Sequence, residues 1–293
     1  MRILVTGGNG QLGRCLADAL PANWQIISLN RQQLDVTDWQ CVQTTVAAVE
    51  ADVIVNTAAY TLVDKAEQEV AAAEAVNITG PAYLAAAAEL NGIPLVHIST
   101  DYVFDGAGEA ASLREDSPTT PLNTYGRTKL LGEQSAMAAC SHVVVIRTSW
   151  LFSEHGNSFV HTMLKLGLAR ESLSIINDQF GCPTYAGDLA KCILTIIRQG
   201  INESKLYHFC GDKPVSWFEF AAEIFAQAQI VDERYGSLKL NCISSEQYRC
   251  AAERPKNAIL NCEKIYHECG ISSSDWQYSL GKVVPIIISR MSN

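Results

Sequence analysis

The chain has 293 residues, which at roughly 150 residues per domain predicts one large domain or two of moderate size. Its 22 Lys+Arg and 31 Asp+Glu give a net charge of −9, which argues against nucleic acid or an anionic membrane as the main partner. No apolar run approaches the roughly 18 residues of a membrane span, and glycines follow the first short apolar run too closely for a signal peptide. We therefore expect a cytoplasmic protein whose ten cysteines are reduced and mostly structural.

The first half of the chain alternates short β-branched runs with longer Ala-rich or amphipathic stretches. This order is typical of an α/β fold, here a Rossmann-type doubly wound parallel sheet. Strands are predicted at residues 2–6, 25–29, 52–56, 95–99 and 143–148. Helices are predicted at 11–20, 38–50, 66–76 and 82–90, with a break at Gly80-Pro81, and from about Tyr125 after a loop at about 105–121.

The pattern becomes irregular after Trp150. Helices are predicted at 157–168, 188–198 and 217–227, and short strands at 174–176 and 206–209. We interpret residues 1–150 as a dinucleotide-binding domain and 151–293 as mainly a smaller, C-terminal substrate-binding lobe. A segment near 178–200 is expected to return to the first domain.

A glycine-rich loop joins the first predicted strand to the first predicted helix. Gly7, Gly8, Gly10 and Gly13 satisfy both G-x-x-G-x-x-G and G-x-G-x-x-G. Glycines allow a tight turn and let backbone N–H groups approach a pyrophosphate at the helix N-terminus. Three glycines alone are weak evidence, but this placement favours a dinucleotide site.

The end of the second strand bears on which dinucleotide binds. An acidic residue there would bind the ribose 2′-hydroxyl of NAD, but this chain has Asn30-Arg31, and Arg31 can accept a 2′-phosphate. Asp35 could instead meet the adenine edge. We expect NADPH, with NADH tolerated; the alternative is that Arg31 is an ordinary surface arginine.

Tyr125 and Lys129 lie four residues apart and so share one face of the predicted helix. A phenol is a poor acid at neutral pH unless a cation lowers its pKa, and Lys129 can supply that cation. Thr100 follows the fourth strand at the sheet edge where such folds bind ligands, so its hydroxyl could contact a substrate oxygen that Tyr125 protonates.

These features resemble the extended short-chain dehydrogenase/reductase superfamily, and longer strings narrow the resemblance to the dTDP-4-dehydrorhamnose reductases. The strings lie at residues 56–67, 99–106, 121–129, 147–150 and 177–184. The resemblance runs from Met1 to about Pro183 and resumes around Arg254-Pro255.

The resemblance implies hydride transfer from NAD(P)H to the C4 ketone of dTDP-4-dehydro-6-deoxy-L-mannose, giving dTDP-L-rhamnose. Tyr125 would donate the proton, Lys129 would assist it and hold the nicotinamide ribose, and Thr100 would fix the ketone oxygen. Asp101 and Trp150 would contact the sugar, although Trp150 has the alternative of a core aromatic. The remaining cofactor contacts implied by motif or family position are Gly7, Gly10, Gln11, Leu12, Gly13, Arg31, Asp35, Val36, Ala58, Ala59, Tyr60 and Thr61.

The chain departs from the family at a metal-bridged dimer contact that some members use. The acidic position two residues after the third glycine is Cys15, and residues 186–188 lack the matching acid. We therefore expect no metal requirement, while a homodimer of another kind stays open.

Three other functions are compatible with this fold. A dehydratase would need an acid after the Thr-Asp step, where this chain has Tyr102. A 4-epimerase is disfavoured by the reductase-like strings. A regulatory subunit that binds NADP without turnover is disfavoured because Thr100, Tyr125 and Lys129 are all present.

Overall fold

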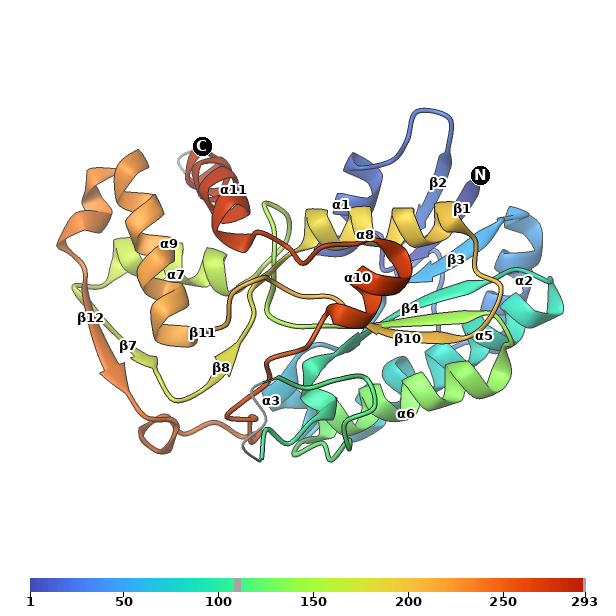
Figure 1. The fold of residues 1–293 in the computed structure, drawn as a ribbon, viewed down its shortest axis with the longest axis horizontal. Helices are drawn as coiled ribbons and strands as arrows, with labels where there is room; N and C mark the ends of the chain where they lie inside the picture. The colour runs from blue at the N-terminus through green and yellow to red at the C-terminus, as the bar shows by residue number, and fades with distance from the viewer. Residues whose placement is uncertain (108–111, 292–293) are drawn as a thin grey trace.

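A computed structural model describes residues 1–107 and 112–291; residues 108–111 of the predicted loop at 105–121 lie outside the described part. Six strands form one sheet in the order β10-β5-β4-β3-β1-β2, and every pair is parallel (Figure 1). They are β1 (Arg2–Thr6), β2 (Gln25–Leu29), β3 (Val53–Asn56), β4 (Leu95–Thr100), β5 (Val143–Thr148) and β10 (Lys205–His208). Residues of β3 and β5 are buried throughout, as expected for strands covered on both faces.

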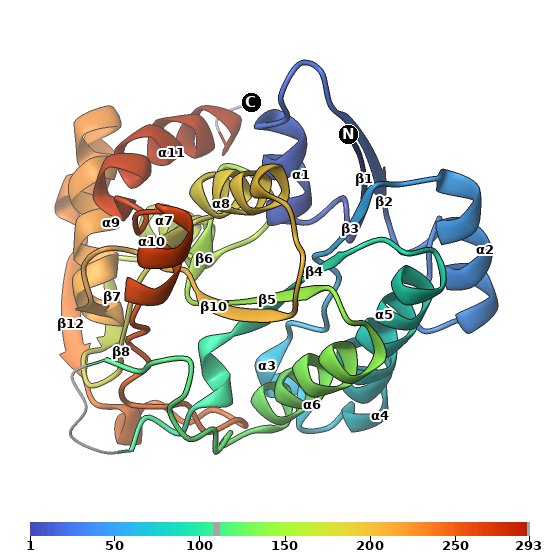
Figure 2. The same ribbon diagram turned by 45° about the vertical axis from the view of Figure 1, so that its right-hand side comes forward.

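Helices cover both faces of the sheet (Figure 2). One face carries α1 (Gln11–Asp18), α8 (Ala186–Gln199) and α10 (Glu263–Cys269). The other carries α2 (Trp39–Val49), α5 (Gly80–Leu90) and α6 (Thr124–Ala139). The predicted doubly wound fold is therefore confirmed. No helix in the described ranges has the length and apolar character to cross a membrane.

A second hydrophobic cluster lies beside the sheet, at the left of Figure 1. It is built on α7 (Phe159–Ala169), α9 (Trp217–Val231) and α11 (Trp276–Met291), next to the pair β7 (Ser172–Ile176) and β12 (Lys239–Ile243). Segments after Trp150 contribute to both hydrophobic clusters, because α8 packs on α1 and β10 pairs with β5 in the main sheet. The division at residue 150 stays a prediction.

Short elements complete the fold. They are α3 (Val63–Ala66), α4 (Val70–Glu74), a π-helical turn (Ala75–Thr79), β6 (Leu151–Phe152), β8 (Phe180–Gly181), β9 (Thr184–Tyr185), β11 (Val215–Ser216), and 3₁₀ turns at Asp101–Val103, Glu233–Ser237 and Ser245–Gln247.

The helix break predicted at Gly80-Pro81 is wrong. Helical residues continue from Val70 to Leu90, with the π-helical turn between α4 and α5. Pro81 stands in the first turn of α5, where a missing N–H is tolerated. The wide turn before it also presents the Asn77 carbonyl to Gly132 of α6, where a Cβ would lie 2.0 Å from that oxygen.

Candidate active site

A cleft of about 760 Å³ lies at the carboxyl ends of the central strands. Nearly all the site residues predicted from sequence line it: Gly7, Gly10, Gln11, Leu12, Arg31, Asp35, Val36, Ala58, Ala59, Tyr60, Thr61, Thr100, Asp101, Tyr125, Lys129 and Trp150. Gly13 is the one predicted residue that the lining does not include; it lies beneath the loop instead. Residues from distant parts of the sequence thus share one cavity.

The glycine loop is packed too closely for side chains. Gly7 has φ +68°, a conformation that favours glycine, and a Cβ there would lie 2.8 Å from the Ala58 nitrogen. A Cβ on Gly13 would lie 2.7 Å from the Gly8 Cα. Gly10 is the N-cap residue of α1, so the loop delivers its backbone N–H groups and the helix N-terminus to the cleft.

Arg31 and Asp35 lie beyond β2 and differ in their surroundings. The Arg31 side chain is exposed at the cleft wall. The Asp35 carboxylate accepts hydrogen bonds from the Thr37 backbone N–H and hydroxyl, at 3.0 and 2.7 Å. These bonds lower the pKa of Asp35, with a smaller contribution from Arg31. Asp35 is therefore held ionised while Arg31 is free to meet an anion.

Asn77 holds the loop that follows β3. Its side chain accepts from the Tyr60 backbone N–H at 2.8 Å and donates to the Tyr60 carbonyl at 3.1 Å. It also donates to the Thr128 hydroxyl at 3.1 Å on α6. The π-helical turn therefore couples the cofactor-side loop to the helix of Tyr125. Sequence reasoning missed Asn77 because it is remote from every motif.

Thr100, Asp101 and Tyr125 form a hydrogen-bonded group. The Thr100 hydroxyl donates to Asp101 Oδ1 at 3.0 Å and is hydrogen-bonded to Tyr125. The second carboxylate oxygen of Asp101 is buried without a partner. Burial raises the pKa of Asp101 to about 7, with the Thr100 hydrogen bond opposing it. The site thus places a carboxyl group one hydroxyl away from the phenol.

The pKa of the Tyr125 phenol is not lowered by Lys129, contrary to the prediction from the sequence. Burial raises the pKa of Tyr125 to about 12, and the Thr100 hydrogen bond only partly opposes this. The Lys129 ammonium instead donates to the Ile98 carbonyl at 2.6 Å. The phenol therefore keeps its proton at neutral pH in this chain, as a proton donor must.

Trp150 is half-buried and lies against a second tryptophan that sequence reasoning missed. Its ring stacks on Trp217, the first residue of α9, with centroids 3.5 Å apart and planes 10° apart. Both line the cleft. Trp150 has φ +44°, a strained conformation for a non-glycine residue that concentrates at functional sites. No local motif marked Trp217, since only the fold brings α9 to this cavity.

Known proteins are similar to this chain over nearly its whole length. The family model described as RmlD substrate binding domain matches residues 1–288. The dTDP-4-dehydrorhamnose reductase of Aggregatibacter actinomycetemcomitans is 39% identical over 288 residues, covering 96% of this chain and 98% of its own. The one from Escherichia coli strain K12 is 38% identical, covering 97% of both. The protein belongs to the dTDP-4-dehydrorhamnose reductase family.

Solved structures of this family have the same fold as this chain. One from Clostridium acetobutylicum superimposes with TM-score 0.91 at 35% identity over 100% of both chains. One from Bacillus anthracis, in complex with NADP, gives TM-score 0.88 at 36% identity over 96% of this chain and 98% of its own. A Streptomyces venezuelae dTDP-glucose 4,6-dehydratase at 20% identity, TM-score 0.79, shares the fold alone.

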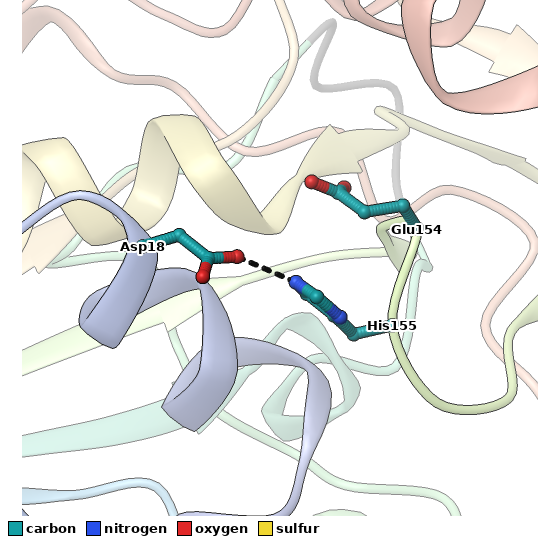
Figure 3. Close-up of side chains that lie close together, drawn as sticks. All are labelled: Asp18, Glu154 and His155. Atoms are coloured by element: carbon teal, nitrogen blue, oxygen red, sulfur yellow. Dashed lines mark hydrogen bonds and ion pairs between the residues drawn. The ribbon is translucent and has the colours of Figure 1, made fainter. Parts of the chain in front are cut away.

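The sequence predicts that this chain lacks the metal contact that some family members use. The residues near Cys15 show what occupies that region. Cys15 is buried, and burial raises the pKa of its thiol to about 12, so it carries no charge for a cation. Within the described ranges, the side chains in this region that could together hold a metal ion are those of Asp18, Glu154 and His155 (Figure 3). His155 Nε2 lies 2.6 Å from Asp18 Oδ2, and Glu154 accepts from the Tyr185 hydroxyl at 3.1 Å. A cation there would compete with the Asp18–His155 contact, whereas the second carboxylate oxygen of Glu154 is buried without a partner among the described residues.

Proposed function

We propose that the protein reduces the C4 ketone of dTDP-4-dehydro-6-deoxy-L-mannose to dTDP-L-rhamnose with NADPH. The observation that carries the proposal is one cleft that unites a glycine cradle with Thr100, Tyr125 and Lys129. The chain around that cleft matches reductases of this name over nearly its whole length.

The cofactor's pyrophosphate fits the glycine cradle, since the cavity above Gly7 and Gly10 is bounded by backbone. Arg31 would hold the 2′-phosphate, Asp35-Val36 the adenosine, and residues 58–61 the middle of the cofactor. Bound NADPH supplies the hydride. The NADP complex of the Bacillus anthracis relative supports this choice of dinucleotide.

Tyr125 gives its proton to the alkoxide that forms at C4. An alkoxide is a far stronger base than a phenolate, so a phenol with a pKa of about 12 still transfers its proton downhill. Thr100 fixes the ketone oxygen through its hydroxyl. Lys129 holds the nicotinamide ribose and keeps a positive charge beside the tyrosinate left after transfer. The buried, protonated state of Tyr125 suits the reductive direction.

Asp101 and Trp150 would hold the sugar. The unpartnered Oδ2 of Asp101 is a buried polar atom in the cleft lining, and a sugar hydroxyl would satisfy it. Trp150, braced by Trp217, offers an apolar edge for the deoxysugar ring. The second, C-terminal lobe would thus complete the substrate site.

The proposal has further parts. NADH is tolerated in place of NADPH although it lacks the 2′-phosphate that Arg31 would hold, no metal is needed, and nucleic acid and membranes are not partners. The protein acts in the cytoplasm, and a homodimer is one possible assembly, which sedimentation at several concentrations would test.

The test is NADPH consumption by the purified chain with freshly prepared dTDP-4-dehydro-L-rhamnose, with and without chelator. We expect rapid oxidation that the chelator leaves unchanged, and NMR of the product should show dTDP-L-rhamnose. Loss of activity with chelator would refute the metal-free part. Tight NADPH binding without oxidation would refute the reductase and favour a non-catalytic binding protein.

A further inference from the structure

A buried cluster of charges lies directly behind Lys129. Glu133 stands one helical turn further along α6, and Arg147 of β5 contacts both its carboxylate oxygens, through Nε at 3.0 and 3.2 Å and Nη2 at 2.8 Å. The Ser99 hydroxyl donates to the same carboxylate. Lys129, Glu133 and Arg147 are all at most 4% exposed. Removing three charged groups from water costs free energy, so a buried cluster of this kind points to a functional role.

We infer that Glu133, clamped by Arg147 and Ser99, is a positioning residue that keeps Lys129 positively charged during the reaction. The inference rests on the proposed function, because it concerns the lysine of that same site. Glu133 touches neither the cleft nor the phenol; it would act only through Lys129.

The physical argument begins with desolvation. Lys129 lies in a buried position where an ammonium loses its hydration, and burial lowers its pKa to about 8. The Glu133 carboxylate opposes that change. Among the described residues, the ammonium donates a hydrogen bond to the Ile98 carbonyl, which carries no net charge. A fixed carboxylate one turn away is therefore a local source of compensating charge.

The clamp holds that carboxylate in place. Arg147 and Ser99 lie opposite each other in the β4–β5 register, so both reach the same side chain from the sheet. Three hydrogen bonds from Arg147 and one from Ser99 fix the orientation of this buried carboxylate. Phe104 covers the guanidinium, with its ring centroid 5.1 Å away.

Among the other described groups near Lys129, Asp101 alone carries part of a negative charge. His97 on β4 is buried, and burial together with Lys129 holds its pKa well below the ordinary value, so it is neutral. The acids on neighbouring helices have partners elsewhere: Asp64 with Arg254, Glu67 with Thr124, Glu69 with Tyr60 and Glu74 with Arg127. On the cleft side stand Tyr125, which is protonated, and Asp101, which burial leaves about half-protonated near neutral pH.

The test compares Glu133→Gln with Glu133→Asp. We expect the alkaline limb of kcat/KM for NADPH-dependent reduction to move down by about one pH unit in Glu133→Gln. Glu133→Asp, which keeps the charge, should return the limb towards the wild-type position even if kcat is lower. NADPH affinity in the absence of substrate should show the same displacement with pH. Asp101 is unchanged in every variant, so its titration cancels in the comparison.

Two controls separate this role from a structural one. Glu203→Gln removes an equal charge from an exposed ion pair with Lys205 and should leave both profiles unmoved. The double variant Glu133→Gln/Arg147→Gln also removes the guanidinium that the single variant leaves unpaired. It replaces the single variant if that protein does not fold. The alkaline limb of its kcat/KM profile should still lie at lower pH than that of the wild type.

The outcomes are distinguishable. If the wild-type chain does not oxidise NADPH with the keto-sugar, the proposed function fails. If it does, but the glutamine variants lose activity equally at every pH and the limb stays in place, Glu133 is merely structural and the inference is overturned.

Discussion

Replacing Gly13 with alanine tests whether the glycine loop is a cofactor cradle built on close packing. The new Cβ would lie 2.7 Å from the Gly8 Cα, 2.8 Å from the Gly8 oxygen and 2.9 Å from the Gly7 oxygen. All three are backbone atoms of the loop itself, so no side chain can rotate away. The loop must retreat by about 0.7 Å to restore the 3.4 Å of ordinary contact.

Overpacking of this kind costs about 1–3 kcal/mol, and the strain falls on the N–H groups that would face the pyrophosphate. If about 2 kcal/mol of that is lost from cofactor binding, NADPH affinity falls roughly 30-fold. The lost binding should raise KM for NADPH far more than it lowers kcat, because Tyr125 and Thr100 come from other elements.

Fluorescence titration with NADPH measures this effect directly. Gly236→Ala is the matched control, since a Cβ there meets only the Gln229 side-chain oxygen at 3.7 Å. Gly236→Ala should bind NADPH as the wild type does. Wild-type affinity in Gly13→Ala, with an unchanged melting temperature, would refute the packing argument.

The remaining predictions concern the cleft residues. Tyr125→Phe should lose about 10²- to 10⁴-fold in kcat while NADPH binding stays nearly intact; full turnover would remove the proton-donor role. Arg31→Ala should weaken NADPH more than NADH, and equal weakening in paired titrations would make Arg31 a surface residue only. For Asp101, burial raises the pKa to about 7 in the folded chain. The wild type therefore loses stability as pH rises from the unfolded-state value towards 7, because only the unfolded carboxyl ionises there. Asp101→Asn lacks this loss, so urea unfolding should show it gaining on wild type between about pH 4 and pH 7; a constant difference would contradict the burial argument.

Local sequence determined the parts of the protein that short-range physics controls. The bounds of β1, β2 and β5 follow from β-branched runs between breakers, and they are confirmed residue for residue. The glycine loop could be placed because its spacing and its position between strand and helix are both local. The Tyr125–Lys129 pair likewise needs only helical periodicity.

Tertiary structure decided everything that depends on which distant segments meet. The sequence predicts that Pro81 breaks a helix. In the structure the chain stays helical through Pro81, and the π-helical turn before it packs on Gly132. Trp217 reaches the cleft only because α9 packs beside β6 and α7, and no pattern in the sequence records that approach. The pKa of Tyr125 is the clearest case: spacing suggested a lowered value from Lys129, whereas burial raises it. Desolvation depends on all the chain around a group, so it cannot be derived from the residues on either side of it.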